Sequence, residues 1–233
     1  MKLLWELLSE VRRKLTLRAK PATSYFLTTK TTTPLSTKYG FDRGTPIDRY
    51  YIEAFLTQNK KHIRGTCLEL TDDAYTRLFG EDRVTRSDVL DINTHNTHAN
   101  IHGDLRSLGN IQRNTYDSII LTQVLGMIDD IHAVISECYR VLKPGGTLLL
   151  TSSSLSPAYN QGTSYWRFTI SSIRYLLRKQ FRPEDCEVIS FGNVLAGQCF
   201  WVGMAQEELT KEELDYNDTR FPVIIAACAT KHI

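Results

Sequence analysis

Carboxylates near the ends of two expected strands are the first residues in this sequence that could do chemistry. Glu69 closes an apolar run at 66–70, and Asp88 follows a second run at 83–87, 19 positions after Glu69 (88 − 69). A polar turn at 71–75 leads from the first run into a short helix. This layout is typical of a nucleotide-binding βαβ unit, in which the first turn lies against the ligand. We expect Asp88 to bind a pair of ribose hydroxyls.

Further polar residues follow the next expected strands. Residues 101–105 are expected to form a short third strand that ends with Asp104 and Leu105, and Thr122 and Gln123 follow a buried strand at 118–121. The ends of parallel strands meet at one edge of a sheet, where ligands bind. For each acidic residue the alternative is a strand-end cap or an ordinary surface charge.

Three histidines, His95, His98 and His102, have a spacing that would suit metal ligands on a helix. The Asn-Thr repeats around them are poor helix formers. A solvated loop is therefore favoured, and no metal site is predicted.

The elements that must position these residues alternate between strand and helix. Helices are expected at 47–59, 131–142, 169–180 and 194–208, and further strands at 147–151, 186–191 and 222–229. This alternation predicts an α/β fold with a doubly wound, mostly parallel, seven-stranded sheet. The last strand, 222–229, is expected to run antiparallel near one edge.

Composition excludes several classes of protein. The chain has 233 residues, of which 42% are hydrophobic and 23% charged, which is ordinary for a soluble globular protein. Its net charge of +2 is too small to indicate nucleic-acid binding. The five cysteines are scattered without a CxxC pair, so neither a disulfide framework nor a zinc site is indicated. With no export signal or spanning segment recognised, we expect a cytoplasmic protein.

The N-terminal region, 1–38, is expected to be an extension of the main domain, 39–233. Residues 1–20 are basic and have apolar residues at helical spacing, and 21–38 read as a connector. Such a helix packs on its own domain or on a second copy in a homodimer; the alternative is peripheral contact with an anionic membrane.

The order of elements resembles class I S-adenosylmethionine-dependent methyltransferases over roughly 48–231. Residues 141–148, Val-Leu-Lys-Pro-Gly-Gly-Thr-Leu, are very similar to the family's segment before its fifth strand. Residues 163–169 resemble a segment of small-molecule and glycan-modifying members. More narrowly, 39–48 together with 68–91 resemble bacterial methyltransferase-domain proteins often found alongside glycosyltransferases.

The sequence departs from this family at two places. The family's first turn is usually glycine-rich, whereas residues 70–75 contain no glycine and carry Asp72 and Asp73. Met127 occupies the place after the fourth strand where the family often has a histidine, which removes that general base.

The resemblance implies S-adenosylmethionine as cofactor and a role for each matching residue. Glu69 and the Thr71–Asp72 turn would face the methionine end, and Asp88 the ribose. Asp104 with Leu105 would meet the adenine edge, and Thr122 with Gln123 would line the floor near the sulfur.

The acceptor implied is an oxygen or nitrogen of a glycan or small molecule. Tyr165 and Trp166 would stack on a sugar or ring face, and Arg43 or Arg167 would hold an anionic group. For Trp166 the alternative, a core anchor, is favoured. The weak candidates for a general base are Asp42, Asp48, His132 and Tyr165. Two alternatives remain open: a non-catalytic methyltransferase-like subunit, and the same fold used for another reaction such as cyclisation.

Overall fold

The computed structural model describes residues 32–158 and 164–233. The helix expected at 1–20, with its possible homodimer or membrane contact, lies outside these residues. Within them, no helix combines the length and the apolar character needed to cross a lipid bilayer. The expected boundary between 1–38 and 39–233 stays a prediction.

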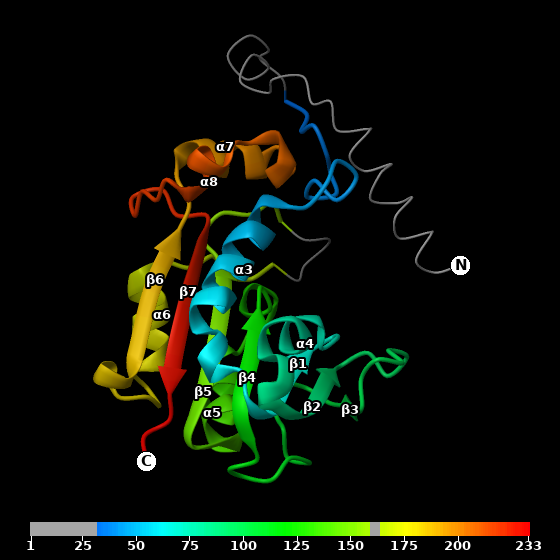
Figure 1. Ribbon diagram of the computed structural model, residues 1–233, viewed down its shortest axis with the longest axis vertical. Coiled ribbons are helices and arrows are strands. Elements are labelled where there is room, and N and C mark those ends of the chain that lie inside the picture. Colours follow the sequence, from blue (N-terminus) through cyan, green and yellow to red (C-terminus); the bar gives the residue numbers. More distant parts are fainter. Residues whose placement is uncertain (1–31, 159–163) are drawn as a thin grey trace. The chain divides into compact units, whose positions relative to one another are not determined.

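Seven strands form one sheet in the order β3-β2-β1-β4-β5-β7-β6 (Figure 1). Their bounds are β1 Gly65–Leu70, β2 Val84–Asp91, β3 Ile101–His102, β4 Tyr116–Thr122, β5 Leu142–Ser153, β6 Cys186–Phe191 and β7 Ile224–Thr230. Strands β1 to β5 pair in parallel, and β7 lies antiparallel between β5 and β6. The doubly wound sheet, with its last strand inserted near one edge, is therefore confirmed.

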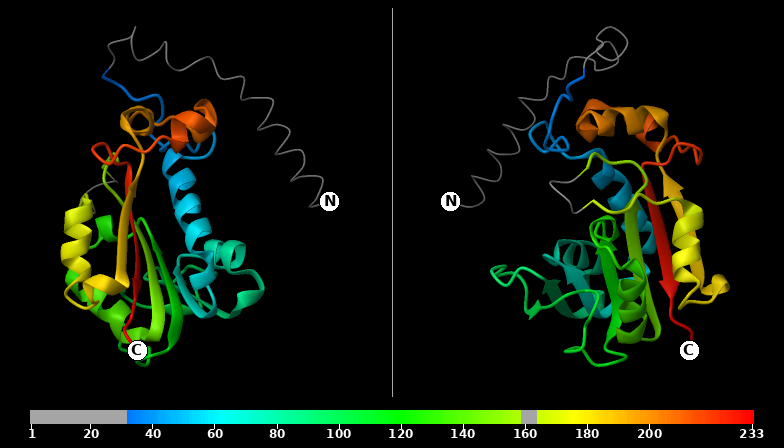
Figure 2. Two further views of the ribbon diagram at one scale, coloured as in Figure 1. Left: turned by 60° about the vertical axis from the view of Figure 1, so that its left-hand side comes forward. Right: turned by 180° about the vertical axis from the view of Figure 1, so that it is seen from behind.

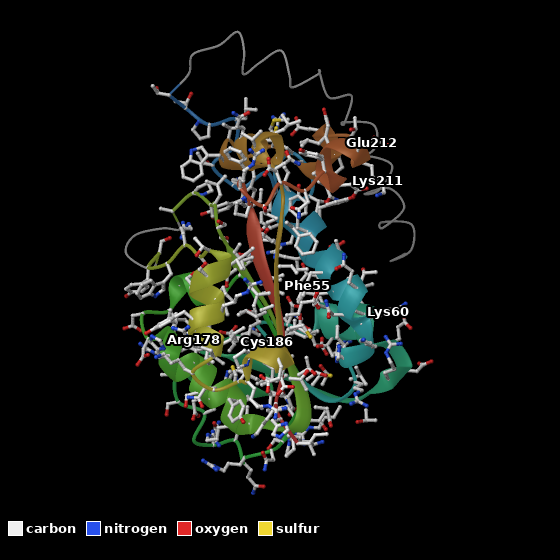
Figure 3. The ribbon with its side chains drawn as sticks, turned by 90° about the vertical axis from the view of Figure 1, so that its left-hand side faces the viewer. Phe55, Lys60, Arg178, Cys186, Lys211 and Glu212 are labelled. Atoms are coloured by element: carbon white, nitrogen blue, oxygen red, sulfur yellow. The ribbon has the colours of Figure 1, made fainter. Side chains whose placement is uncertain are left out.

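Helices cover both faces of this sheet. The helix α4, Ala74–Gly80, packs on β1 and β2, while α5, Ile131–Val141, and α6, Ile170–Leu177, pack together. Figure 2 shows α4 and α6 on opposite faces. The apolar stripe of α5 is buried in the core, as its helical periodicity predicts. Figure 3 shows Phe55 of α3, Ile47–Asn59, pointing toward the strands, and this ring is fully buried.

The chain divides into two compact units. The sheet, α4, α5 and α6 belong to residues 52–154, 158–191 and 224–233, and α3 runs from one unit into the other. The second unit contains residues up to 51, 155–157 and 192–223, with α7, Val194–Trp201, and α8, Lys211–Asp215.

The single helix expected at 194–208 was wrong. The chain leaves α7 at Trp201, and Gly203 adopts a left-handed φ of +81°. A Cβ at Gly203 would lie 2.4 Å from the carbonyl oxygen of Ser36, so this close approach requires glycine. A separate short 3-10 turn, Gln206–Glu208, follows.

Candidate functional site

The sheet contains one point at which its connections diverge. From β1 the chain moves to β2 on one side, whereas from β4 it moves to β5 on the other. In open α/β sheets, ligands bind outside the carboxyl ends of the strands at such a point. Glu69 pairs with Ile120, so the residues just beyond β1 and β4 lie side by side. The candidate site is therefore built from Thr71, from Gln123 and from the end of neighbouring β2.

The turn after β1 is held in a strained conformation. Thr71 has a φ of +70°, and Asp72 N–H donates to the Leu70 carbonyl oxygen over 2.8 Å, closing a γ-turn. A β-branched residue with positive φ is a genuine outlier, and such strain clusters at functional sites. Thr71 and Asp72 are both exposed. The backbone thus follows a path suited to glycine while it carries a threonine.

Glu69 holds this turn in place. Its carboxylate is only 4% exposed and accepts hydrogen bonds from the backbone N–H groups of Tyr75 (3.2 Å) and Thr76 (2.7 Å), in the first turn of α4. Burial raises the pKa of Glu69 to about 7, against the opposing effect of these hydrogen bonds. Glu69 therefore positions the turn, and its expected place facing the methionine end of the cofactor stays a prediction.

The strand expected to end before Asp88 was placed wrongly, because β2 continues to Asp91. Asp88 is 1% exposed, and four donor groups meet its two oxygens, three in hydrogen bonds and one in an ion pair. Oδ1 accepts from Arg86 Nε (3.0 Å) and Asn100 Nδ2 (2.7 Å), and Oδ2 accepts from the Tyr116 hydroxyl (3.1 Å). Arg86 Nη2 also lies 2.9 Å from Oδ2 in an ion pair. A carboxylate has about four acceptor positions, so Asp88 has none left for a ribose.

Asp91 occupies the carboxyl end of β2 and retains acceptor capacity. It accepts one hydrogen bond from Asn93 N–H (2.8 Å) and one from Asn96 Nδ2 (2.7 Å), leaving about two of its four acceptor positions unclaimed. Asn96 also donates to the Thr71 carbonyl oxygen over 2.7 Å, which ties the end of β2 to the strained turn. Sequence reasoning missed Asp91 and Asn96. The signal for Asp91 was its place 22 positions after Glu69 (91 − 69), directly after the apolar pair at 89–90.

The third strand is shorter than expected and ends at His102. Asp104 is bound by Arg106, whose backbone N–H donates to it over 2.8 Å and whose guanidinium also reaches Asp129. These hydrogen bonds from Arg106 lower the pKa of Asp104. The Leu105 side chain is buried in the core.

Gln123 follows β4 directly, as expected, with a left-handed φ of +58°. Its backbone N–H donates to the Thr151 carbonyl oxygen over 2.9 Å, and its Oε1 accepts from Ser153 Oγ over 2.7 Å. Strained residues therefore stand after both β1 and β4. Thr122, the last residue of β4, is half-buried beside Gln123.

Two of the residues expected to bind the methyl acceptor, Tyr165 and Arg167, belong to the unit that contains the sheet. Tyr165 is 53% exposed, and Arg167 donates to Ser164 Oγ (3.0 Å) and to the Trp166 carbonyl oxygen (2.8 Å). Trp166 is 41% exposed, so its assignment as a core anchor was wrong. His132 is exposed in the first turn of α5.

In the second unit, Arg43 is engaged by a bidentate ion pair with Glu208, one arm of which measures 3.0 Å. This partner raises the pKa of Arg43. Asp48 is buried in the first turn of α3, and burial raises its pKa. Asp42 accepts a hydrogen bond from Ser36.

Potential metal ligands do not gather in the described part of the chain. Across 32–158 and 164–233, no group of three His, Cys, Asp or Glu side chains could hold an ion.

Comparison with known proteins shows what this architecture is similar to. A family model described as a methyltransferase domain matches residues 65–150, and no curated protein matches the sequence. A SAM-dependent methyltransferase from Archaeoglobus fulgidus shares the fold, with 14% identity, a TM-score of 0.55, and coverage of 78% of this chain and 94% of that one.

Two further solved structures have the same fold. Phosphoethanolamine N-methyltransferase 2 of Haemonchus contortus, in complex with S-adenosylmethionine, has 13% identity and a TM-score of 0.51, covering 78% of this chain and 53% of that one. The cyclase SpnF has 14% identity and a TM-score of 0.54, with 82% and 84% covered. Residues 65–150 thus match a methyltransferase domain, and the chain shares its fold with S-adenosylmethionine-dependent methyltransferases.

Proposed function

We propose that this protein transfers a methyl group from S-adenosylmethionine to an oxygen or nitrogen of a small-molecule or glycan acceptor. The observation that supports this most is the pair of unclaimed acceptor positions on Asp91, at the carboxyl end of β2 and beside the turn after β1. In nucleotide-binding βαβ units, the acid at this place binds the ribose.

The residues present fit the cofactor. Asp91 can accept from two adjacent ribose hydroxyls, since a carboxylate suits two neighbouring donors. We expect the γ-turn at Thr71 to face the methionine end, and Thr122 and Gln123 to lie near the sulfur, because these residues lie at the carboxyl ends of β1 and β4, at the point where the connections of the sheet diverge. When bound, S-adenosylmethionine supplies a sulfonium methyl group whose bond to sulfur breaks as the acceptor bonds to its carbon, the electron pair remaining on sulfur.

The protein's contribution to this transfer is mainly alignment. Holding two reactants in line can supply about 7–11 kcal/mol of the barrier reduction. A hydroxyl acceptor also loses its proton and benefits from a base. Tyr165, in the unit that contains the sheet, remains a candidate for this base.

Calorimetry tests the cofactor site. S-adenosylhomocysteine should bind the unmodified protein, and Asp91→Ala should weaken it at least tenfold, because each charge-assisted hydrogen bond contributes about 1.5–3 kcal/mol. The same substitution, Asp91→Ala, should weaken binding of 5′-methylthioadenosine by a similar factor, because this compound keeps the ribose but lacks the amino acid. Asp82→Ala is a matched control, an exposed acid on the same sheet unit. Wild-type affinity in a folded Asp91→Ala protein would rule out the ribose assignment.

A second candidate is a different reaction on the same fold, such as cyclisation. It is favoured by the glycine-free turn at 70–75 and by the fold shared with the cyclase SpnF. Absence of binding by both S-adenosylmethionine and S-adenosylhomocysteine would instead support a non-catalytic, methyltransferase-like subunit.

A further inference from the structure

The segment Ser164–Phe168 is fixed against the end of the sheet by its backbone. Tyr165 and Trp166 both donate their N–H groups to the Gly126 carbonyl oxygen (2.8 and 3.2 Å), and Phe168 N–H donates to the Ser153 carbonyl oxygen (3.0 Å). A Cβ at Gly126 would lie 3.2 Å from the Trp166 carbonyl oxygen, a tight contact that glycine avoids. The segment therefore has one defined position next to the loop that follows β4.

This anchoring holds apolar side chains in contact with water. Met127, Tyr165 and Trp166, which we call the aromatic platform, are 37%, 53% and 41% exposed. The indole Nε1 donates to the Ile128 carbonyl oxygen over 2.8 Å, so the ring is held by its polar edge. A tryptophan that served only to fill the core would be buried like Phe168. Fixed aromatic rings left exposed are typical of binding surfaces.

A buried hydrogen-bond donor without a partner lies next to the aromatic platform. Ser153 Oγ donates to one end of the Gln123 carboxamide, and Nε2 at the other end is buried with no partner in the described structure. Ser153 also binds Phe168 through its carbonyl oxygen, which links Gln123 to the platform segment. An unsatisfied buried donor is unfavourable, and Gln123 has strained backbone as well.

We propose that the aromatic platform and Gln123 Nε2 form the acceptor subsite, and that the acceptor has a ring with a flat, carbon-rich face. The ring packs on Trp166 and Tyr165, and an oxygen on the ring accepts from Gln123 Nε2. Two sources share this chemistry, an aromatic ring and the C–H face of a pyranose. The inference rests on the proposed function, because it assigns the acceptor of the same site.

Saturation-transfer NMR on the full chain, with phenol and methyl β-glucopyranoside as probes, tests this subsite. In the presence of S-adenosylhomocysteine, ring protons of at least one probe should receive saturation, and the probe that responds identifies the ring class. Trp166→Ala should lower this signal at least fivefold, while Trp166→Phe keeps part of it. Trp201→Ala is the matched control, since Trp201 is also exposed. No ring signal from either probe, or an unchanged signal in Trp166→Ala, would overturn the proposal.

Gln123→Gly separates binding from structure. It removes the donor and also relieves the left-handed φ, so the melting temperature should not fall while the probe signal drops at least threefold. An unchanged signal would exclude Gln123 from the subsite. S-adenosylhomocysteine affinity of the unmodified protein distinguishes the two proposals. If the unmodified protein binds S-adenosylhomocysteine but gives no ring signal, the acceptor subsite alone is wrong; if it does not bind S-adenosylhomocysteine, the proposed function is wrong.

Discussion

Replacing Asp88 should reduce stability far more than cofactor binding, which reverses the expectation from the sequence. Asp88 is 1% exposed and accepts hydrogen bonds from Tyr116, Asn100 and Arg86. Asn100 in turn accepts from the Val89 N–H over 2.6 Å, so this network fastens the 93–100 loop to β2. Asp88→Ala removes the acceptor that all three donors share.

The expected loss follows from these contacts. The Tyr116 hydroxyl meets Asp88 in a buried setting, and leaving it unpaired costs about 1–3 kcal/mol. The exposed Asn100 can turn to water, so its bond contributes about 0.5–1.5 kcal/mol, and the pair with the exposed Arg86 adds little because water screens it. Removing a buried charge offsets part of this sum. We expect a loss of about 2–3 kcal/mol, or roughly 4–12 °C in melting temperature for a chain of this size.

Thermal and urea unfolding, with calorimetry at matched temperature, measure both effects. S-adenosylhomocysteine affinity should change less than about threefold in Asp88→Ala, because the 93–100 loop loosens while Asp91 is intact. Asp88→Asn should lie between, since its amide keeps one acceptor oxygen. An Asp88→Ala protein that melts like the unmodified one but has lost cofactor affinity would refute the assignment to Asp91 and restore Asp88 as the ribose ligand.

Two further predictions concern the turn after β1. Thr71→Gly should raise the free energy of unfolding by about 1 kcal/mol, because glycine adopts a φ of +70° without the strain of a β-branched residue. Thr71→Val keeps the β-branched side chain and should bring no gain. Equal stability of the two variants in urea would show that the backbone at Thr71 is not strained. Glu69 has a pKa of about 7 in the folded protein, above its ordinary value, so its contribution to stability is complete below about pH 4.5 and is lost as the pH rises through 7. Glu69→Gln should therefore flatten the decline in unfolding free energy between pH 5 and pH 8, and an unchanged slope in urea titrations would show that Glu69 does not titrate there.

The sequence alone determined the fold class because the apolar periodicities are local. The helix at 47–59 and the strand at 186–191 occur at the predicted residues, since a continuous apolar face or run specifies them. The N-caps Thr169 and Thr210 are local features of the same kind, because a capping side chain bonds to backbone only three residues away. The local pattern did not predict that the helix ends before Gly203. Glycine is required there because the backbone of Ser36, which is distant in sequence, lies too close for a side chain.

Only the tertiary structure decided which acid of β2 is available to a ligand. Asp88 and Asp91 are three residues apart in one strand, so their side chains point to opposite faces of the sheet. Asp88 meets Tyr116 from β4 and Asn100 from the following loop, and these partners consume its acceptor positions. In the same way, the exposure of Trp166 depends on the Gly126 and Ile128 carbonyl groups, some 40 residues earlier (166 − 126). Such contacts join residues distant in sequence, so no local pattern of apolar and polar residues records them.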